Sequence, residues 1–189
     1  MFLAVVIVAL GLDLASKEAM FRQRGMPGQQ PPIWLVQEML SLETSLNEGA
    51  LFGMGAGWGL LFIALSFVAL LGIGYWVWRG GAAADGLLCF ALGCVTGGIL
   101  GNLYDRLGLP ALNWTPQLKL DRPELIGTPV YAVRDFIHFK CNWFDWPIFN
   151  LADSFLVCGV GLLIFHAYVW EPRRKKAESL GEAAQRVTA

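Results

Sequence analysis

The sequence has few charged residues and few of the patterns that build metal, disulfide or serine-nucleophile sites. Charged side chains make up 15% of the 189 residues and the net charge is −1, which argues against nucleic-acid binding. Of the four cysteines only Cys141 lies in a polar segment, so we expect no disulfide framework. His138 and His166 lack an H-E-x-x-H context, and no serine has a G-x-S-x-G setting, so zinc and serine hydrolysis are poorly supported.

Hydrophobic residues, by contrast, are abundant and occur in long runs. They form 56% of the chain, and the mean hydropathy of +0.51 indicates a membrane protein. A membrane-spanning helix needs about 20 apolar residues, and segments 54–78, 86–104 and 148–170 meet this length. Within the second segment Gly93, Gly97 and Gly101 recur every four residues, which predicts a helix face that neighbouring helices approach closely.

The N-terminal apolar segment is shorter than the other three. Residues 2–12 are apolar, Asp13 and Lys17 interrupt the run, and residues 19–21 restore it in part. Eleven apolar residues are too few to span a membrane, so we expect a fourth transmembrane helix that starts upstream of Met1. The alternative is a secretory signal peptide, but no basic residue precedes the run and no A-x-A site follows it.

The basic residues predict the orientation. A run of Arg173, Arg174, Lys175 and Lys176 follows the last apolar segment, and such residues remain preferentially in the cytoplasm. With four spans, both termini are then cytoplasmic, and the connections 22–53 and 105–147 are outside. The predicted fold is a mainly α, polytopic membrane protein with four transmembrane helices and a small extracytoplasmic β/loop platform. Its membrane domain covers residues 1–171, and residues 172–189 form a basic, then mobile, cytoplasmic tail.

This topology brings the polar residues of the apolar segments to the extracytoplasmic face. Asp13 and Lys17 are four residues apart and form an ion pair on one helix face, for which an architectural and a functional role are equally open. Asn102 and Arg106 are also one helical turn apart. An arginine at a helix end often extends to the lipid headgroups, whereas a deeper asparagine needs polar partners.

Asp135 and Asp153 are the candidate catalytic residues. Asn150 and Asp153 share a face in the first turns of the last helix, where capping is the alternative role for Asp153. Asp135 taken alone is compatible with a solvated position on an interfacial strand. Two nearby carboxylates resist simultaneous ionisation, so one keeps a proton and acts as an acid while the other acts as a base on water.

Five segments resemble, in order, the conserved blocks of lipoprotein signal peptidase, also called signal peptidase II. They are residues 13–17 (DLASK), 47–53 (NEGALFG), 97–106 (GGILGNLYDR), 133–137 (VRDFI) and 149–153 (FNLAD). Each block alone is weak evidence for this family, but five blocks in the family's order, over four predicted spans, are specific to it. The resemblance covers residues 2–170.

The resemblance implies an aspartic endopeptidase of the bacterial cytoplasmic membrane. Its substrates would be diacylglyceryl-modified prolipoproteins, cut just before the lipidated cysteine, near the extracytoplasmic face and in contact with membrane lipids. It implies Asp135 and Asp153 as catalytic residues and neither a metal nor an organic cofactor. Supporting residues that match the family pattern are Asn47, Gly49, Asn102, Arg106, Asn150 and Ala152, with Asp13 and Lys17 as the first-helix motif.

Three departures from the family pattern stand out. The N-terminal helix is short, Leu51 replaces a small residue, and a long, proline-containing link joins Arg106 to Asp135. We interpret residues 107–132 of this link as an external insert, a loop or hairpin that alters access to the site. The alternative functions are a small polytopic transporter, which would place polar groups at several depths, and an inactive lipoprotein-binding scaffold.

Overall fold

A computed structural model describes residues 1–49, 57–118 and 123–174. The predicted start of the second span at residue 54, Leu51 and the tail beyond residue 174 lie outside these described residues. The helices and strands run in the order α1 (Phe2–Arg24), β1 (Ile33–Val36), β2 (Leu40–Asn47), α2 (Gly59–Trp78), α3 (Gly86–Arg106), β3 (Val133–Cys141), β4 (Phe144–Asp145) and α4 (Leu151–Phe165). A π-helical turn, η5 (His166–Trp170), continues α4.

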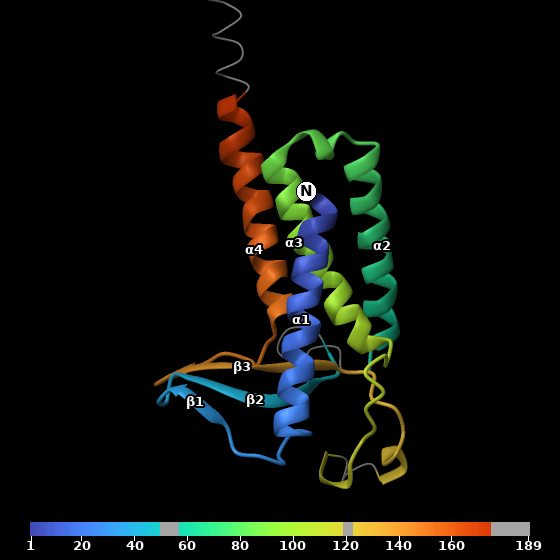
Figure 1. Cartoon of the computed structure of the whole chain (residues 1–189), viewed down its shortest axis with the longest axis vertical. Coiled ribbons are helices and arrows are strands. Elements are labelled where there is room, and N and C mark those ends of the chain that lie inside the picture. Colours follow the sequence, from blue (N-terminus) through green and yellow to red (C-terminus); the bar gives the residue numbers. More distant parts are fainter. Residues whose placement is uncertain (50–56, 119–122, 175–189) are drawn as a thin grey trace, which may run out of the picture.

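The helices form an elongated bundle with the sheet and the insert at one end (Figure 1). The N-terminus lies at the opposite end, so α1 and α3 run towards the sheet and α2 and α4 run away from it (Figure 1). This arrangement brings the polar clusters of α1, α3 and the start of α4 together at the sheet end, as the sequence predicts. Helices α2, α3 and Leu151–Arg174 are long and apolar enough to cross a membrane.

Helix α1 continues through its charged residues, with Asp13 and Lys17 paired on one face as predicted. It continues for 23 residues, and Asp13 and Lys17 are fully buried within it. Their 2.8 Å ion pair and their contacts with α3 and α4 offset the cost of burying them. The fourth transmembrane helix is not confirmed, because only the three other helices reach the length and apolarity of a span among the residues that the structure describes.

Close packing of α3 against α1 and α4 confirms the prediction from the glycine spacing. A Cβ built on Gly97 would lie 2.5 Å from Ala9 of α1, and one on Gly93 would lie 2.8 Å from Val5. Gly98, on a neighbouring face, meets the backbone of α4 at Ala152. Glycine therefore sets the spacing of three helices.

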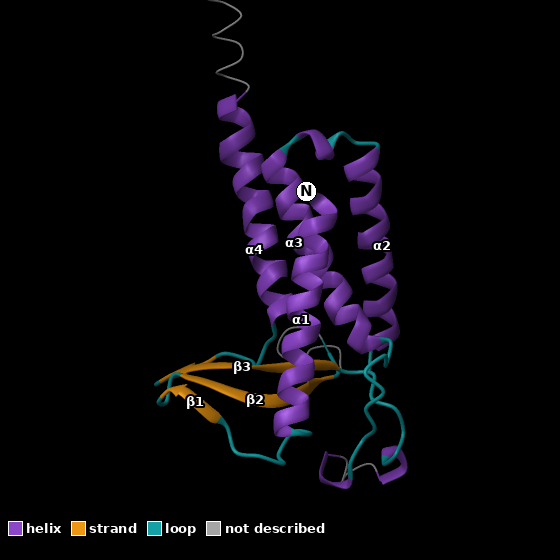
Figure 2. Cartoon of the chain, viewed as in Figure 1, coloured by secondary structure: helices purple, strands orange, loops and turns teal. Residues whose placement is uncertain are grey.

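The four strands form one antiparallel sheet in the order β1-β2-β3-β4 (Figure 2). Strands β2 and β3 pair with Ser45 opposite Asp135 and Asn47 opposite Val133. Helix α4 starts three residues later than predicted, because Phe149 pairs with Ile137 of β3 instead of beginning the helix. The small sheet is confirmed, and it connects the 22–47 region to the start of α4.

The described residues of the predicted insert, 107–118 and 123–132, fold back on one another as a hairpin. Gly108 ends α3 in a left-handed conformation, and the ring of Tyr131 packs over it so closely that a Cβ there would lie 2.8 Å from the ring. Antiparallel bonds then join the two limbs, from Trp114 N–H to the Thr128 carbonyl (3.0 Å) and from Val130 N–H to the Leu112 carbonyl (2.8 Å). Trp114 and Val130 are buried in a core shared with the end of α1 and with β3.

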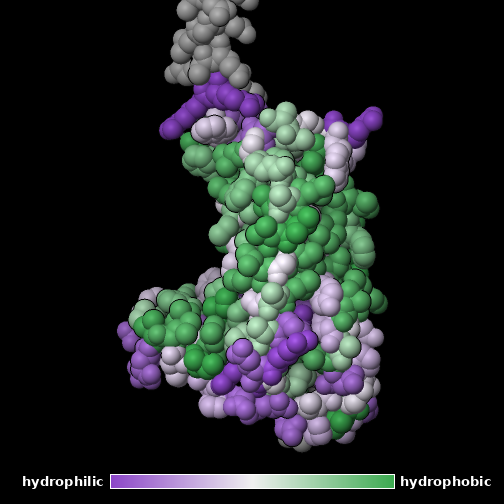
Figure 3. Space-filling model, viewed as in Figure 1, coloured by the Kyte–Doolittle hydropathy of each residue, from purple (hydrophilic) through white to green (hydrophobic). Residues whose placement is uncertain are grey.

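Surface hydropathy separates the bundle from the sheet end. In Figure 3 hydrophobic residues cover the helices, and hydrophilic residues gather at the sheet end and at the opposite tip. At that tip Asp85 caps α3 by accepting the Leu88 N–H, and its other oxygen contacts His166 (3.0 Å) and Arg174 (2.9 Å). The apolar surface between the two polar ends is the part that suits hydrocarbon.

Candidate active site

Asp135 is held at the centre of the sheet end by pairing on both sides of β3. Strand β2 pairs with it on one side, and on the other Phe136 and Ile137 both donate backbone N–H bonds to the Phe149 carbonyl. Asn150 follows Phe149 directly, so this pairing places the Asn150 side chain beside Asp135. The Asp135 side chain is 1% exposed, which rules out the solvated position considered from the sequence.

Asn150 joins the two candidate catalytic carboxylates. Its Nδ2 donates to Asp135 Oδ1 (2.6 Å), and its backbone N–H donates to Asp153 Oδ2 (3.2 Å). Its own Oδ1 accepts the Asp153 N–H (3.0 Å), which completes a capping box at the start of α4. Asp153 therefore caps the helix as the sequence allowed, and it also lies next to Asp135.

Asn102 supports the same cluster from the last turns of α3. Its Nδ2 donates to Asp153 Oδ1 (2.7 Å), and its Oδ1 accepts from Asn150 Nδ2 (3.1 Å) and from Lys17 Nζ (3.1 Å). These three bonds fix which way the Asn102 amide faces, because only its oxygen can accept. The deep polar side chain on α3 thus has the partners that its position requires.

The Asp13–Lys17 pair connects α1 to the cluster. Asp13 Oδ1 accepts the backbone N–H of Ala152 (2.9 Å), and Lys17 Nζ also contacts Asp105 Oδ2 (3.0 Å). A helix start leaves its first N–H groups without helical partners, and Asp13 satisfies one of them. The pair is thus bonded both to the backbone of α4 and to an amide that contacts Asp153.

Sequence reasoning did not single out Arg134 and Glu18, and it gave Asp105 no role. Arg134 is 2% exposed and donates to Asp105 through Nε (2.8 Å) and its backbone N–H (3.1 Å). Its Nη1 also donates to Glu18 Oε2 (3.2 Å). The sequence did contain a signal for Arg134. It is a charged residue directly before Asp135 in a predicted strand, and because neighbouring side chains of a strand point to opposite faces, it would need a polar partner on the other face.

Ala152 is required by space rather than by chemistry. It is fully buried where α4 crosses α3, with its carbonyl 2.5 Å from a Cβ built on Gly98 and its own Cβ 3.2 Å from one on Gly101. A Cβ on Gly101 would also meet the Asp13 carboxylate. A larger residue at any of these positions would separate α3 from α4 next to Asp153.

Arg106, Gly49 and Asn47 form the side of the site nearest α2. Arg106 Nη2 donates to the Gly49 carbonyl (3.0 Å), and its guanidinium lies 5.2 Å from the centre of the Phe62 ring. Gly49 N–H in turn donates to Asn47 Oδ1 (3.0 Å). Arg106 is thus held against protein instead of extending to solvent, and all ten residues predicted for the site lie in or next to one cluster.

A cavity of about 520 Å³ opens beside this cluster. Asp153, Asn102, Arg106 and Asn47 line its polar end, and apolar residues of α3 and α4 such as Ile99 and Leu156 line the rest. A smaller cavity of about 280 Å³ reaches Asp135 from the β2 side. An apolar cavity with a few polar groups at one end suits an amphipathic ligand.

Burial raises the pKa of Asp135 to about 7, and the neighbouring Asp153 carboxylate adds to the rise. Hydrogen bonds from Asn150 and Asn47 and the charge of Lys17 act in the opposite direction but are outweighed. A carboxyl group with this pKa still holds its proton in about half of the molecules near pH 7, which suits a general acid.

Fold and site together define a helical membrane protein with paired carboxylates at one end of its bundle. A family model described as signal peptidase (SPase) II matches residues 5–169. A lipoprotein signal peptidase of Rhodopirellula baltica is 44% identical over 170 residues, which cover 89% of this chain and 71% of that protein. One from Sulfurihydrogenibium sp. is 28% identical, covering 92% of this chain and 94% of that protein.

A solved bacterial membrane enzyme has the same fold, with a TM-score of 0.70 at 22% identity over 92% of this chain and 90% of that one. The family match covers most of the chain. The chain therefore belongs to the signal peptidase II family, as the five sequence blocks predicted.

Proposed function

We propose that this chain is an aspartic endopeptidase that removes signal peptides from diacylglyceryl-modified prolipoproteins by cutting before the lipidated cysteine. Family membership makes it a peptidase. The observation that carries the aspartic mechanism is the position of Asn150, which donates one hydrogen bond to Asp135 and another to Asp153.

The two carboxyl groups have different surroundings, which supports different roles. Asp153 lies at the start of α4 and accepts N–H bonds on both oxygens, which orients its carboxylate for the role of base. Asp135 has the raised pKa of an acid. In this mechanism Asp153 takes a proton from water, the water oxygen attacks the peptide carbonyl, and Asp135 supplies the proton that the leaving amine needs.

The remaining residues of the cluster would hold this pair and the substrate. Asn102 and Lys17 orient Asp153, Asp13 anchors the start of α4, and Arg106 with the turn that includes Gly49 borders the cavity beside Asp153. The apolar part of that cavity, between α3 and α4, suits the signal segment of a prolipoprotein.

We further propose that α1 is the fourth transmembrane helix. Its 23 residues rise about 35 Å, which exceeds the ~30 Å hydrocarbon core. Its most polar side chains, Asp13 and Lys17, face α3 and α4 and are fully buried. In the proposed topology, residues 1–171 form the membrane domain in the bacterial inner membrane, both termini are cytoplasmic, and the sheet, the insert and the site are extracytoplasmic.

The proposal is tested by cleavage of a diacylglyceryl-modified prolipoprotein with purified protein. Asp135→Asn and Asp153→Asn should each lower kcat by at least ~10²-fold, the scale of a lost general acid or base. Asp145→Asn is the matched control, because this residue is 57% exposed on β4, and it should retain normal cleavage. Normal turnover by either site variant, or no cleavage by the folded native chain, would refute the aspartic mechanism.

A further inference from the structure

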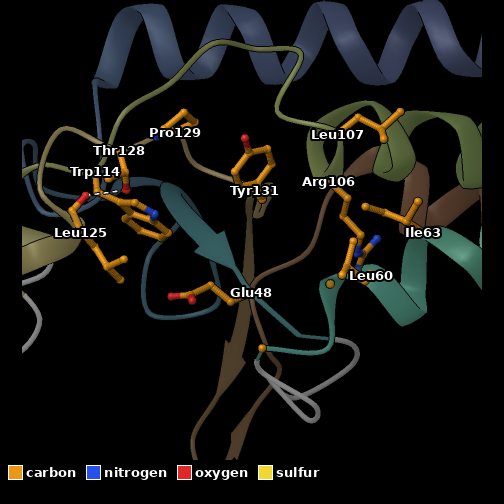
Figure 4. Close-up of a pocket in the computed structure, with 12 residues that line it drawn as sticks. Glu48, Leu60, Ile63, Arg106, Leu107, Trp114, Leu125, Thr128, Pro129 and Tyr131 are labelled. Carbon is orange, nitrogen blue, oxygen red and sulfur yellow. Dashed lines mark hydrogen bonds between the residues drawn. The ribbon is translucent and has the colours of Figure 1, made fainter.

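A second apolar cavity lies beside the site, between the first turns of α2 and the 107–132 insert. Its volume is about 560 Å³, within the range of small-molecule sites. Leu60 and Ile63 of α2 line it on one side, and Trp114 and Leu125 of the insert line it on the other (Figure 4). The insert therefore forms a wall of a cavity instead of only lengthening a loop.

Charged residues connect this cavity to the candidate active site. Arg106 lines both this cavity and the one that contains Asp153. Glu48 likewise lines both this cavity and the small one that contains Asp135. A molecule bound at the carboxylate pair can therefore extend past Arg106 into the space behind it.

Backbone polar groups of the insert wall are already hydrogen-bonded within the insert. Trp114 N–H donates to the Thr128 carbonyl (3.0 Å), and Gly127 N–H donates to the Trp114 carbonyl (2.9 Å). The Thr128 hydroxyl donates to the Leu125 carbonyl (2.6 Å). A bound peptide chain would need backbone partners, whereas an alkyl chain needs only apolar contact, so this wall favours an alkyl chain.

The cavity lies where a lipid chain could enter from the side. Leu60 lines it and is 84% exposed, in the first turn of a helix that is long and apolar enough to span a membrane. Tyr131 of the insert lines it too and is 60% exposed. An opening at the end of a membrane-spanning helix lies at the edge of the hydrocarbon layer.

We infer that this cavity binds one acyl chain of the diacylglyceryl group on the substrate cysteine, with Arg106 between the acyl chain and the carboxylate pair. The inference rests on the proposed function, because it assigns a subsite to that substrate. It also gives the insert a role: the insert selects substrates by acyl-chain length.

Two variants that fill the cavity from opposite walls test the inference. Ile63→Trp fills it from α2 and Leu125→Trp fills it from the insert. For a dipalmitoyl substrate each should raise KM about tenfold, while KM for a dibutyryl substrate should change less than about twofold. Ile164→Trp is the matched control, because this residue is 56% exposed on α4 away from the cavity, and it should leave both KM values unchanged.

Photocross-linking supplies a second readout that does not require turnover. A substrate with a diazirine on one acyl chain, bound to the Asp135→Asn variant, should label peptides containing residues 57–63, 107–118 or 123–131. Labelling confined to α4, or equal loss of both substrates in both tryptophan variants, would overturn the acyl site. A native chain that cleaves neither substrate would instead refute the proposed function, since cross-linking reports binding alone.

Discussion

At the scale of single residues, the site consists of carboxylates separated by amides. Asn150 lies between Asp135 and Asp153, and Asn102 lies between Asp153 and Lys17. Most of these bonds join residues of different elements, and the bond from Asn150 to Asp153 joins the N-cap of α4 to its first turn. Such a network is sensitive to single substitutions, because each group lost leaves a buried partner unsatisfied.

Asp135→Asn should stabilise the protein while abolishing cleavage. The pKa of Asp135 is about 7 in the folded protein against an ordinary 3.8, so between these values the folded state holds a proton that the unfolded state releases. Stability of the native chain should therefore fall as pH rises from about 4 to 7, by about 1.4 kcal/mol per pKa unit. Asparagine resembles the neutral acid and avoids this loss.

Thermal unfolding in detergent from about pH 4 to about pH 8 measures this effect. The midpoint of Asp135→Asn should exceed that of the native chain by a margin that widens up to about pH 7 and then stays constant, at roughly 2–4 °C per kcal/mol. A margin that narrows with rising pH would contradict the raised pKa. Asp145→Asn serves as the control, because hydrogen bonds from His138 and Lys140 lower the pKa of this exposed carboxyl, so its midpoint margin should not widen as pH rises.

Arg134→Met should destabilise the protein strongly. It removes the Nε donor to buried Asp105 and the Nη1 donor to Glu18. Lys17 is then the one cation still paired with both Asp13 and Asp105 among the described ion pairs. Breaking a buried pair costs about 3–5 kcal/mol, which a fall in the thermal unfolding midpoint would report.

The matched control for Arg134→Met is Arg22→Met, which breaks an exposed pair with the same Glu18. Exposed pairs contribute up to about 1 kcal/mol, so its thermal midpoint should hardly move. Arg134→Lys keeps the charge but lacks the planar fork, so its midpoint should lie between the native and Met values. Equal midpoints for Arg134→Met and Arg22→Met would show that the buried network contributes little.

At the scale of elements, the site depends on how closely α4 packs against α3. Gly98→Ala should separate these helices, because its Cβ would lie 2.5 Å from the Ala152 carbonyl and 2.7 Å from Leu156. Overpacking of this kind costs about 1–3 kcal/mol. Because the contact lies one residue from Asp153, kcat should fall as well.

Gly161→Ala is the control for Gly98→Ala, since a Cβ at Gly161 on α4 would meet no atom within 4 Å. Alanine favours a helix over glycine by up to ~1 kcal/mol, so this variant should be neutral or slightly more stable. Cleavage kinetics and unfolding midpoints of both variants would be compared. If Gly98→Ala behaved like Gly161→Ala, α3 and α4 would have room that the structure does not show.

The sequence predicted the helices, strands and site residues better than it predicted which residues contact one another across elements. Glycine spacing identified the face of α3 that packs on α1, but Gly98 lies off that stripe and its contact with α4 was missed. The aspartates and amides were predicted by type and position. Arg134 was not, because its partners Asp105 and Glu18 are 29 and 116 positions away, and no local pattern reports such distances.

At the scale of the whole molecule, the polar ends and the apolar middle predict a topology that labelling can test. Cys141 lies in the sheet, and Ala83 is exposed in the connection between α2 and α3 at the other end (Figure 1). In intact spheroplasts a membrane-impermeant maleimide should label Cys141 and leave an Ala83→Cys variant on a Cys141→Ser background unlabelled.

Permeabilised spheroplasts are the control for this labelling, because the reagent then reaches both faces and should modify the Ala83→Cys variant as well. The labelled protein would be detected by a mass shift. If intact spheroplasts showed labelling of the Ala83→Cys variant but not of Cys141, the proposed orientation would be reversed and the carboxylate pair would lie in the cytoplasm.

The pairing of β2 with β3 also bears on the order of assembly during synthesis. Ser45 meets Asp135, so β2 waits for its partner until α2 and α3 have both been made. Until then the nascent chain exposes an unpaired strand edge, and Asp135 has neither Asn150 nor Asp153 beside it. In the proposed mechanism, proteolytic competence therefore arises last, after the final helix has been translated, and an incomplete chain in the membrane would carry no active protease.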